Sequence, residues 1–184
     1  MKICKTSLYL CISAILYCNP PTKPEVHAPP DIAGVFTSPA NGCGNSNFIA
    51  YKSNSLKSKW IIVKANRDSL ALTTEFKTFI INTSLSHLTV HFDYYSINKD
   101  SIRQHNFAYC DDAMEVNAQI PESWNAIDGS VDMKRSEIDS SGIFYDFSVT
   151  VHLRNIRLVN PVKTDTVFLK KLNLDIVRVG WMPG

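Results

Sequence analysis

Apolar and polar residues alternate along much of the chain after about residue 47, which is the period of strands with one buried face. The clearest run is Tyr145–Arg154, whose odd positions are all apolar and whose even positions are all polar. Leu88–Tyr94 repeats the pattern. Shorter strands are expected at Asn47–Lys52, Lys59–Ala65, Ala71–Phe76, Thr78–Asn82, Glu115–Gln119, Ser130–Glu137 and Thr166–Lys170.

The last strands alternate with an interruption. Leu172–Ile176 and Val177–Trp181 each follow the two-residue period, but the second run is shifted by one residue relative to the first. A β-bulge inserts one extra residue into a strand and produces such a shift. The sequence therefore predicts a bulge where the two runs meet.

The pattern as a whole indicates an all-β domain, since no helical period of useful length separates the strands. Roughly eight to ten short strands without helices favour an antiparallel β-sandwich, immunoglobulin-like or jelly-roll-like, over a parallel α/β sheet. An eight-stranded β-barrel is the alternative. A chain of 184 residues suits one such domain.

The N-terminus has the order of an export signal, with Lys2 and Lys5 before an apolar stretch that is too short to cross a bilayer as a helix. Ile15-Leu16-Tyr17-Cys18 resembles a lipobox, in which the cysteine is acylated and becomes the new N-terminus. Tyr17 departs from the small residue of that pattern, so ordinary secretory cleavage near Cys18 and an uncleaved anchor remain alternatives. We expect residues 1–17 to be a lipoprotein signal peptide.

A proline-rich segment follows, with five of the nine prolines between residues 20 and 30. Proline removes backbone donors and favours an extended chain, so we expect residues 18–40 to be the anchor cysteine and a tether. Residues 41–184 are then the domain. The expected location is the bacterial cell envelope, with the outer membrane favoured.

Two cysteines, Cys43 and Cys110, remain in the expected domain. In an oxidising compartment an isolated pair favours a disulfide bond, with two separately buried thiols as the alternative. The pair lacks the short spacing of zinc ligands. No metal or other cofactor is expected.

The sequence contains no recognisable catalytic motif, and no catalytic residue is assigned. His87 and His91 lie four apart in a strand, too far along it for one metal ion, and are expected on the polar face. The acidic group Asp111, Asp112 and Glu115 lacks the order of a calcium loop and is interpreted as solvated. A carboxylate pair of the glycosidase kind would meet in space and leave no motif.

Aromatic residues offer one candidate for ligand binding. Trp60 and Trp181 adjoin apolar strands and are expected in the core. Trp124 has polar neighbours and is expected to be exposed, where its ring could stack on a sugar. Without residues 1–17 the chain carries 17 basic and 17 acidic residues, which argues against nucleic-acid binding.

The stretches Cys43–Lys52, Trp124–Val131 and Val179–Gly184 resemble small, uncharacterised lipoproteins of Bacteroidota-type bacteria. The resemblance covers about residues 43–184 and implies lipid attachment and an envelope location, without an activity or ligand. We therefore expect a membrane-anchored, non-catalytic binding or scaffolding module whose partner is a glycan or an envelope protein. An envelope enzyme acting on glycans is the alternative.

Overall fold

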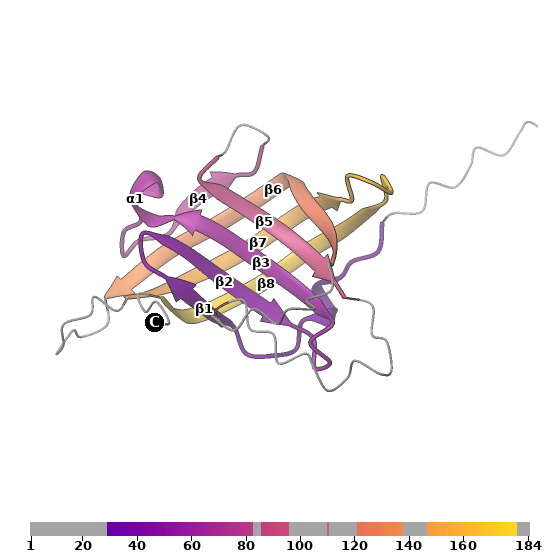
Figure 1. Ribbon diagram of the computed structural model, residues 1–184. Coiled ribbons are helices and arrows are strands. Elements are labelled where there is room, and N and C mark those ends of the chain that lie inside the picture. Colours follow the sequence, from indigo (N-terminus) through magenta and orange to yellow (C-terminus); the bar gives the residue numbers. More distant parts are fainter. Residues whose placement is uncertain (1–28, 83–85, 96–109, 111–120, 138–146, 180–184) are drawn as a thin grey trace, which may run out of the picture.

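The structure is a computed structural model that describes residues 29–82, 86–95, 110, 121–137 and 147–179. These residues form eight strands, one short α-helix and one 3-10 turn (Figure 1). Their bounds are η1 Ala33–Val35, β1 Asn41–Gly44, β2 Asn47–Ser53, β3 Lys59–Asn66, α1 Arg67–Leu70, β4 Lys77–Ile80, β5 Leu88–Tyr94, β6 Glu122–Glu137, β7 Phe147–Val159 and β8 Thr166–Val179. No helix among them is long and apolar enough to cross a membrane.

All eight strands belong to one sheet in the order β1-β2-β3-β5-β6-β7-β8, with β4 paired to β6 beside β5. Every pair of neighbouring strands is antiparallel. The sheet curls into a half-barrel, with β1, β2, β3 and β5 forming one wall and β6, β7 and β8 the other (Figure 1). The all-β antiparallel class expected from the alternation is confirmed.

The concave side of the sheet, here called the inner face, holds the main hydrophobic core. Alternate residues of each strand point into it, and the most deeply buried include Phe48, Ile61, Val63, Val131, Met133, Leu153, Ile156, Leu158, Leu169 and Leu174. Burying a large aliphatic side chain contributes about 1.5–3 kcal/mol. The two-residue period thus fixes which side of each strand faces the core.

The two ends of the sheet approach each other through side chains of β8 and the backbone of β1. A Cβ atom at Gly42 would collide with the Val177 side chain and the Ile49 carbonyl oxygen, and would lie 3.1 Å from the Val179 side chain. Both valines are buried. Glycine at position 42 therefore allows β8 to pack closely against β1.

The bulge predicted in the last strand is confirmed. Ile176 has a φ of 52° and is 74% exposed, and the pairing of β7 with β8 shifts register beside it. The runs expected as separate strands are one strand, β8. Residues 180–184, including Trp181, lie outside the described residues.

The strand expected at Ala71–Phe76 is not formed. Asn66 caps α1 by accepting a 2.7 Å hydrogen bond from the Ser69 amide, and Ala71 ends the helix with a φ of 46°. Asn is a favoured N-cap because its side chain satisfies a free amide of the first turn. The turn rotates the chain off the strand path, which overturns the strand assignment. Glu115–Gln119 lies outside the described residues.

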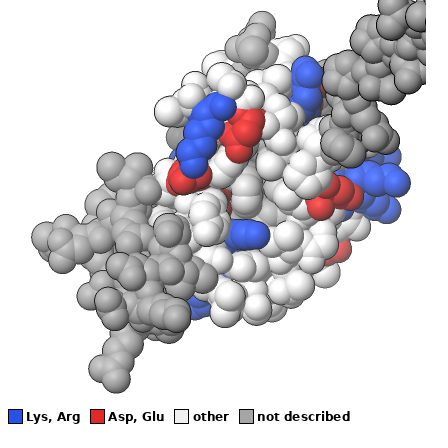
Figure 2. All heavy atoms as spheres, turned by 90° about the vertical axis from the view of Figure 1, so that its right-hand side faces the viewer, with Lys and Arg blue, Asp and Glu red and all other residues white. Residues whose placement is uncertain are grey.

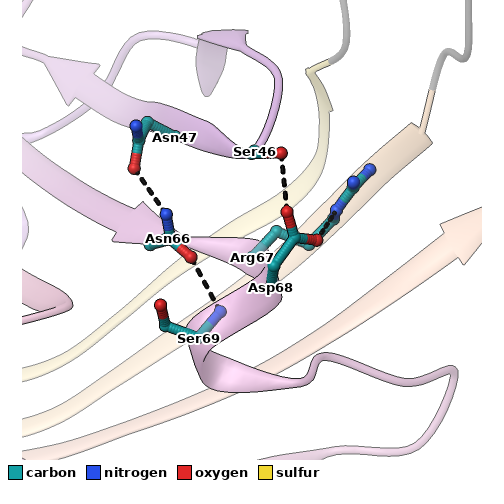
Figure 3. A network of polar contacts seen from close by, with 6 residues as sticks. All are labelled: Ser46, Asn47, Asn66, Arg67, Asp68 and Ser69. Atoms are coloured by element: carbon teal, nitrogen blue, oxygen red, sulfur yellow. Dashed lines mark hydrogen bonds and ion pairs between the residues drawn. The ribbon is translucent and has the colours of Figure 1, made fainter.

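A polar network connects this helix to the β1–β2 turn (Figure 3). The Ser46 hydroxyl donates to Asp68 at 2.6 Å, and Arg67 Nε pairs with the same carboxylate at 2.9 Å. The Asn66 amide donates to Asn47 at 2.8 Å. The hydrogen bonds from Ser46 and Arg67 lower the pKa of Asp68 below its usual value.

Strand β6 bends where its partner changes from β5 to β4. Gly129 has a φ of 119° and lies within the second of two register shifts in the β6–β7 ladder, which fall on either side of Asp128. On β7, Asn155 also has a positive φ, 52°, and its carbonyl oxygen would lie 2.7 Å from a Cβ atom at Gly129. These facing irregularities separate the part of β6 that pairs with β5 from the part that pairs with β4.

Residues 29–40 belong to the expected tether, and in the structure they contact the domain. The Ile32 amide donates to the Phe168 carbonyl at 2.8 Å, and the Phe168 amide donates to the Pro30 carbonyl at 3.1 Å. The Asp31 side chain accepts a hydrogen bond from the Lys170 amide at 3.1 Å. Phe36 is 4% exposed in the core. The described chain therefore joins the edge of β8 before β1 begins.

Candidate functional site

The convex side of the sheet, here called the outer face, carries a second apolar cluster over β2 and β3. Tyr51, Trp60 and Ile62 are buried there, and Ile49, Tyr95 and Cys110 pack against them. The indole N–H of Trp60 donates to the Lys57 carbonyl at 2.7 Å. Trp60 is buried as expected, but on the outer face.

A disulfide joins β1 to this outer cluster. The bond joins Cys43 to Cys110, whose Cα atoms lie 5.7 Å apart. Cys43 pairs with Ile49 in the β1–β2 ladder, which directs its side chain toward the cluster. The bond spans 67 residues of sequence.

Beside the apolar cluster lies a surface that we call the polar groove, formed by three adjoining hollows of about 340, 290 and 330 Å³. The first two share Lys64, the first and third share Thr89, and the last two share His91 and Asn125. Apolar residues form part of its lining, and the polar part consists of amide, hydroxyl and imidazole side chains with one Lys and one Asp: Asn47, Lys64, Asn66, Asn82, Ser86, His87, Thr89, His91, Asp93, Ser123 and Asn125.

The strand register places these groups in rows across the outer face. Ile62, His91 and Asn125 are consecutive partners from β3 to β5 to β6. In the same way Asp93 of β5 is opposite Ser123 of β6. Residues opposite each other on one face of antiparallel strands lie close enough to interact. The groove is therefore built by pairing strands distant in sequence.

Hydrogen bonds orient the side chains at the centre of the groove. The Ser123 hydroxyl donates to Asp93 at 2.6 Å. His91 contacts Asn125 Oδ1 through Nδ1 at 2.7 Å and Thr89 Oγ1 through Nε2 at 3.0 Å. Because the Asn oxygen only accepts, Nδ1 donates to it, and Nε2 of the neutral ring then accepts from the Thr89 hydroxyl.

This arrangement orients polar groups without assembling a serine nucleophile with its base. Ser123 contacts Asp93, while His91 contacts Thr89 and Asn125. Among the described residues no three His, Cys, Asp or Glu side chains come together to hold a metal ion. The groove offers fixed donors and acceptors to a ligand.

The expectation that Trp124 is exposed is corrected by the structure. Its side chain is on the inner face, 6% exposed, with its ring centroid 5.0 Å from that of Phe92. Its polar neighbours Ser123 and Asn125 are on the outer face, because successive strand residues point to opposite sides. Trp124 therefore offers no ring to a ligand at the surface.

The two histidines four residues apart lie in different parts of the polar groove. His87 is exposed just before β5 and lines the first hollow, whereas His91 lies at the centre of the groove. Cys18 lies outside the described residues, as does the acidic group around Asp111 and Glu115.

Charged side chains of both signs are present at the end of the molecule drawn in Figure 2. Figure 2 shows the end of the molecule that lies at the right of Figure 1, where Lys and Arg stand apart from one another among uncharged residues and close to Asp and Glu. A surface that binds nucleic acid gathers positive charge in one patch. This end does not have that pattern.

No protein-family model, curated protein or solved structure matches the chain.

Proposed function

We propose that the protein is an envelope lipoprotein, anchored through Cys18, whose domain is a non-catalytic module that binds a glycan in the polar groove. The observation that carries the binding proposal is the groove itself. Oriented amide, hydroxyl and imidazole groups from β3, β5 and β6 meet there beside an apolar cluster.

The lining matches a ligand that is rich in hydroxyl groups. Amide and hydroxyl side chains both donate and accept hydrogen bonds, as sugar hydroxyls do. Ile49 is a partly buried member of the outer apolar cluster that also lines the groove, where it offers apolar contact to sugar C–H groups. Asn125 is exposed, and its amide nitrogen has no described partner.

The enzyme alternative requires two carboxylates about 5–10 Å apart. Asp93 is the single carboxylate among the described residues that line the groove. The described part of the groove thus favours binding over glycoside hydrolysis.

For the form of the sheet we propose an eight-stranded barrel rather than a sandwich. The close packing of β8 against Gly42 of β1 supports this proposal, since it brings the two ends of one sheet together.

A His91→Ala variant should bind the glycan about tenfold more weakly, because the hydrogen bonds of His91 hold the Asn125 and Thr89 side chains in place, and loss of one oriented contact worth about 1.4 kcal/mol lowers affinity tenfold. The measurement is a glycan-array screen of residues 29–184, followed by titration against the best ligand. His152→Ala is the matched control, since His152 lies on β7 and pairs with Asp175 at 3.2 Å. Equal affinity of the two variants would exclude the groove as the glycan-binding site. Turnover of a polysaccharide would show that the protein is an enzyme and overturn the proposal of a non-catalytic module.

A Cys18→Ala variant of the full chain should lose its N-terminal acyl mass and its lipid-dependent association with membranes. Mass spectrometry and fractionation in a bacterial host measure both. Cys11→Ala is the control, because Cys11 lies within the apolar stretch and would be removed with the signal. Unchanged membrane association without an acyl group would refute the anchor.

A further inference from the structure

Lys64 occupies a central position in the polar groove. It lies on β3 between Ile49 of β2 and Thr89 of β5 in the strand register, and it lines two of the three hollows. Its side chain is exposed. No hydrogen bond or ion pair to a described residue is present at its ammonium group, so its positive charge is available to a ligand.

The one negative charge in the lining is differently placed. Asp93 is 8% exposed, and its carboxylate accepts the hydrogen bond from Ser123. A buried carboxylate with a short hydrogen bond is held by the protein, whereas an exposed ammonium can form an ion pair with an incoming group. The exposed charge in the described lining of the groove is therefore the positive charge of Lys64.

From this contrast we infer that the polar groove recognises an acidic sugar, whose carboxylate binds the Lys64 ammonium while its hydroxyls bind the groups around His91 and Asn125. The inference rests on the proposed function and names the ligand class of the same site. A neutral glycan would leave Lys64 without an ionic partner, whereas a uronic-acid unit supplies a carboxylate and hydroxyls on one ring.

The experiment compares polygalacturonate with its fully methyl-esterified form, which keeps the hydroxyls and removes the charge. Binding to residues 29–184 is titrated at low and high salt, with poly-L-glutamate as a carboxylate polymer without sugar. The variants are Lys64→Gln and Lys64→Arg. Lys171→Gln is the matched control, because Lys171 is an exposed lysine on β8 outside the groove.

We expect the acidic polymer to bind and the esterified form to bind about three- to fivefold more weakly, because a single exposed ion pair changes affinity by about this factor. Lys64→Gln should remove the difference, Lys64→Arg should retain it, and Lys171→Gln should leave it unchanged. High salt should reduce it, because salt screens exposed charges.

The outcomes separate the inference from the proposed function. Equal binding of the acidic and esterified polymers, lost in His91→Ala, would overturn the acidic ligand and leave glycan binding standing. If poly-L-glutamate binds as tightly as polygalacturonate, the groove recognises negative charge in general, and the inference of an acidic sugar is wrong. Binding of no glycan, here or on the array, would overturn both.

Discussion

Replacing both Cys43 and Cys110 by alanine is expected to lower the free energy of unfolding by about 4 kcal/mol. A disulfide restricts the unfolded chain, and the chain-entropy model gives about this value for a loop of 67 residues. Small domains are typically stable by only about 5–15 kcal/mol, so the variant should be marginal. Urea unfolding of the variant and of the wild-type protein measures the difference.

Reduction of the wild-type protein is the control, because it opens the same loop without changing the sequence. It should cause nearly the same loss, and peptide mapping without reductant should give one cross-linked peptide containing both cysteines. Two freely alkylated thiols, or a loss below about 1 kcal/mol, would show that the bond does not stabilise the domain.

A Gly129→Ala variant should lose about 2–3 kcal/mol of unfolding free energy. Its φ of 119° is unfavourable for any residue with a Cβ, and the new Cβ would lie 2.7 Å from the Asn155 carbonyl oxygen. Because Gly129 lies in the bend of β6, a shift there should also weaken ligand binding in the groove. Denaturant unfolding and the glycan titration test the two effects.

Gly34→Ala is the matched control, since a Cβ at Gly34 has no heavy atom within 4 Å. Its effect should lie within about 0.5 kcal/mol, as for most surface substitutions. Equal stability of the two variants would show that the positive φ at Gly129 is not required for the stability of the fold. If the Gly129→Ala variant is destabilised but binds its ligand unchanged, the bend of β6 contributes to stability and not to binding in the groove.

The sequence predicts strands well where alternation is uninterrupted. The bounds of β5 match the expected Leu88–Tyr94, and the phase shift locates the bulge at Ile176. Prediction fails where capping chemistry competes with alternation. At Asn66 the side-chain cap begins a helix. The apolar residues of the expected strand Ala71–Phe76 therefore belong to no strand.

Trp124 shows why polar neighbours are a poor guide to exposure in a strand. The polar residues Ser123 and Asn125 indicate a solvent-exposed segment. They lie in β6 together with Trp124, but their side chains point to the outer face and that of Trp124 points to the inner face. The expected strand covers only Ser130–Glu137. In the structure Asp128-Gly129 is a bend within a longer strand, β6.

The polar groove leaves no motif in the sequence. His91 was singled out by its spacing from His87, but its partner Asn125 is 34 residues away. Their meeting depends on the pairing of β5 with β6, which local patterns do not specify. Period-two alternation indicates that His91 points away from the core, but it does not identify its neighbours.

The contacts of residues 30–32 with β8 determine how the domain responds to mechanical load. Any pull on the chain at residue 29 is first resisted by the parallel bridge between Asp31 and Phe168 and by the hydrogen bond from the Lys170 amide to the Asp31 side chain. Behind this bridge, Phe36 is embedded in the core. Tension along the chain is thereby borne at the edge of β8 before it reaches β1 and the disulfide.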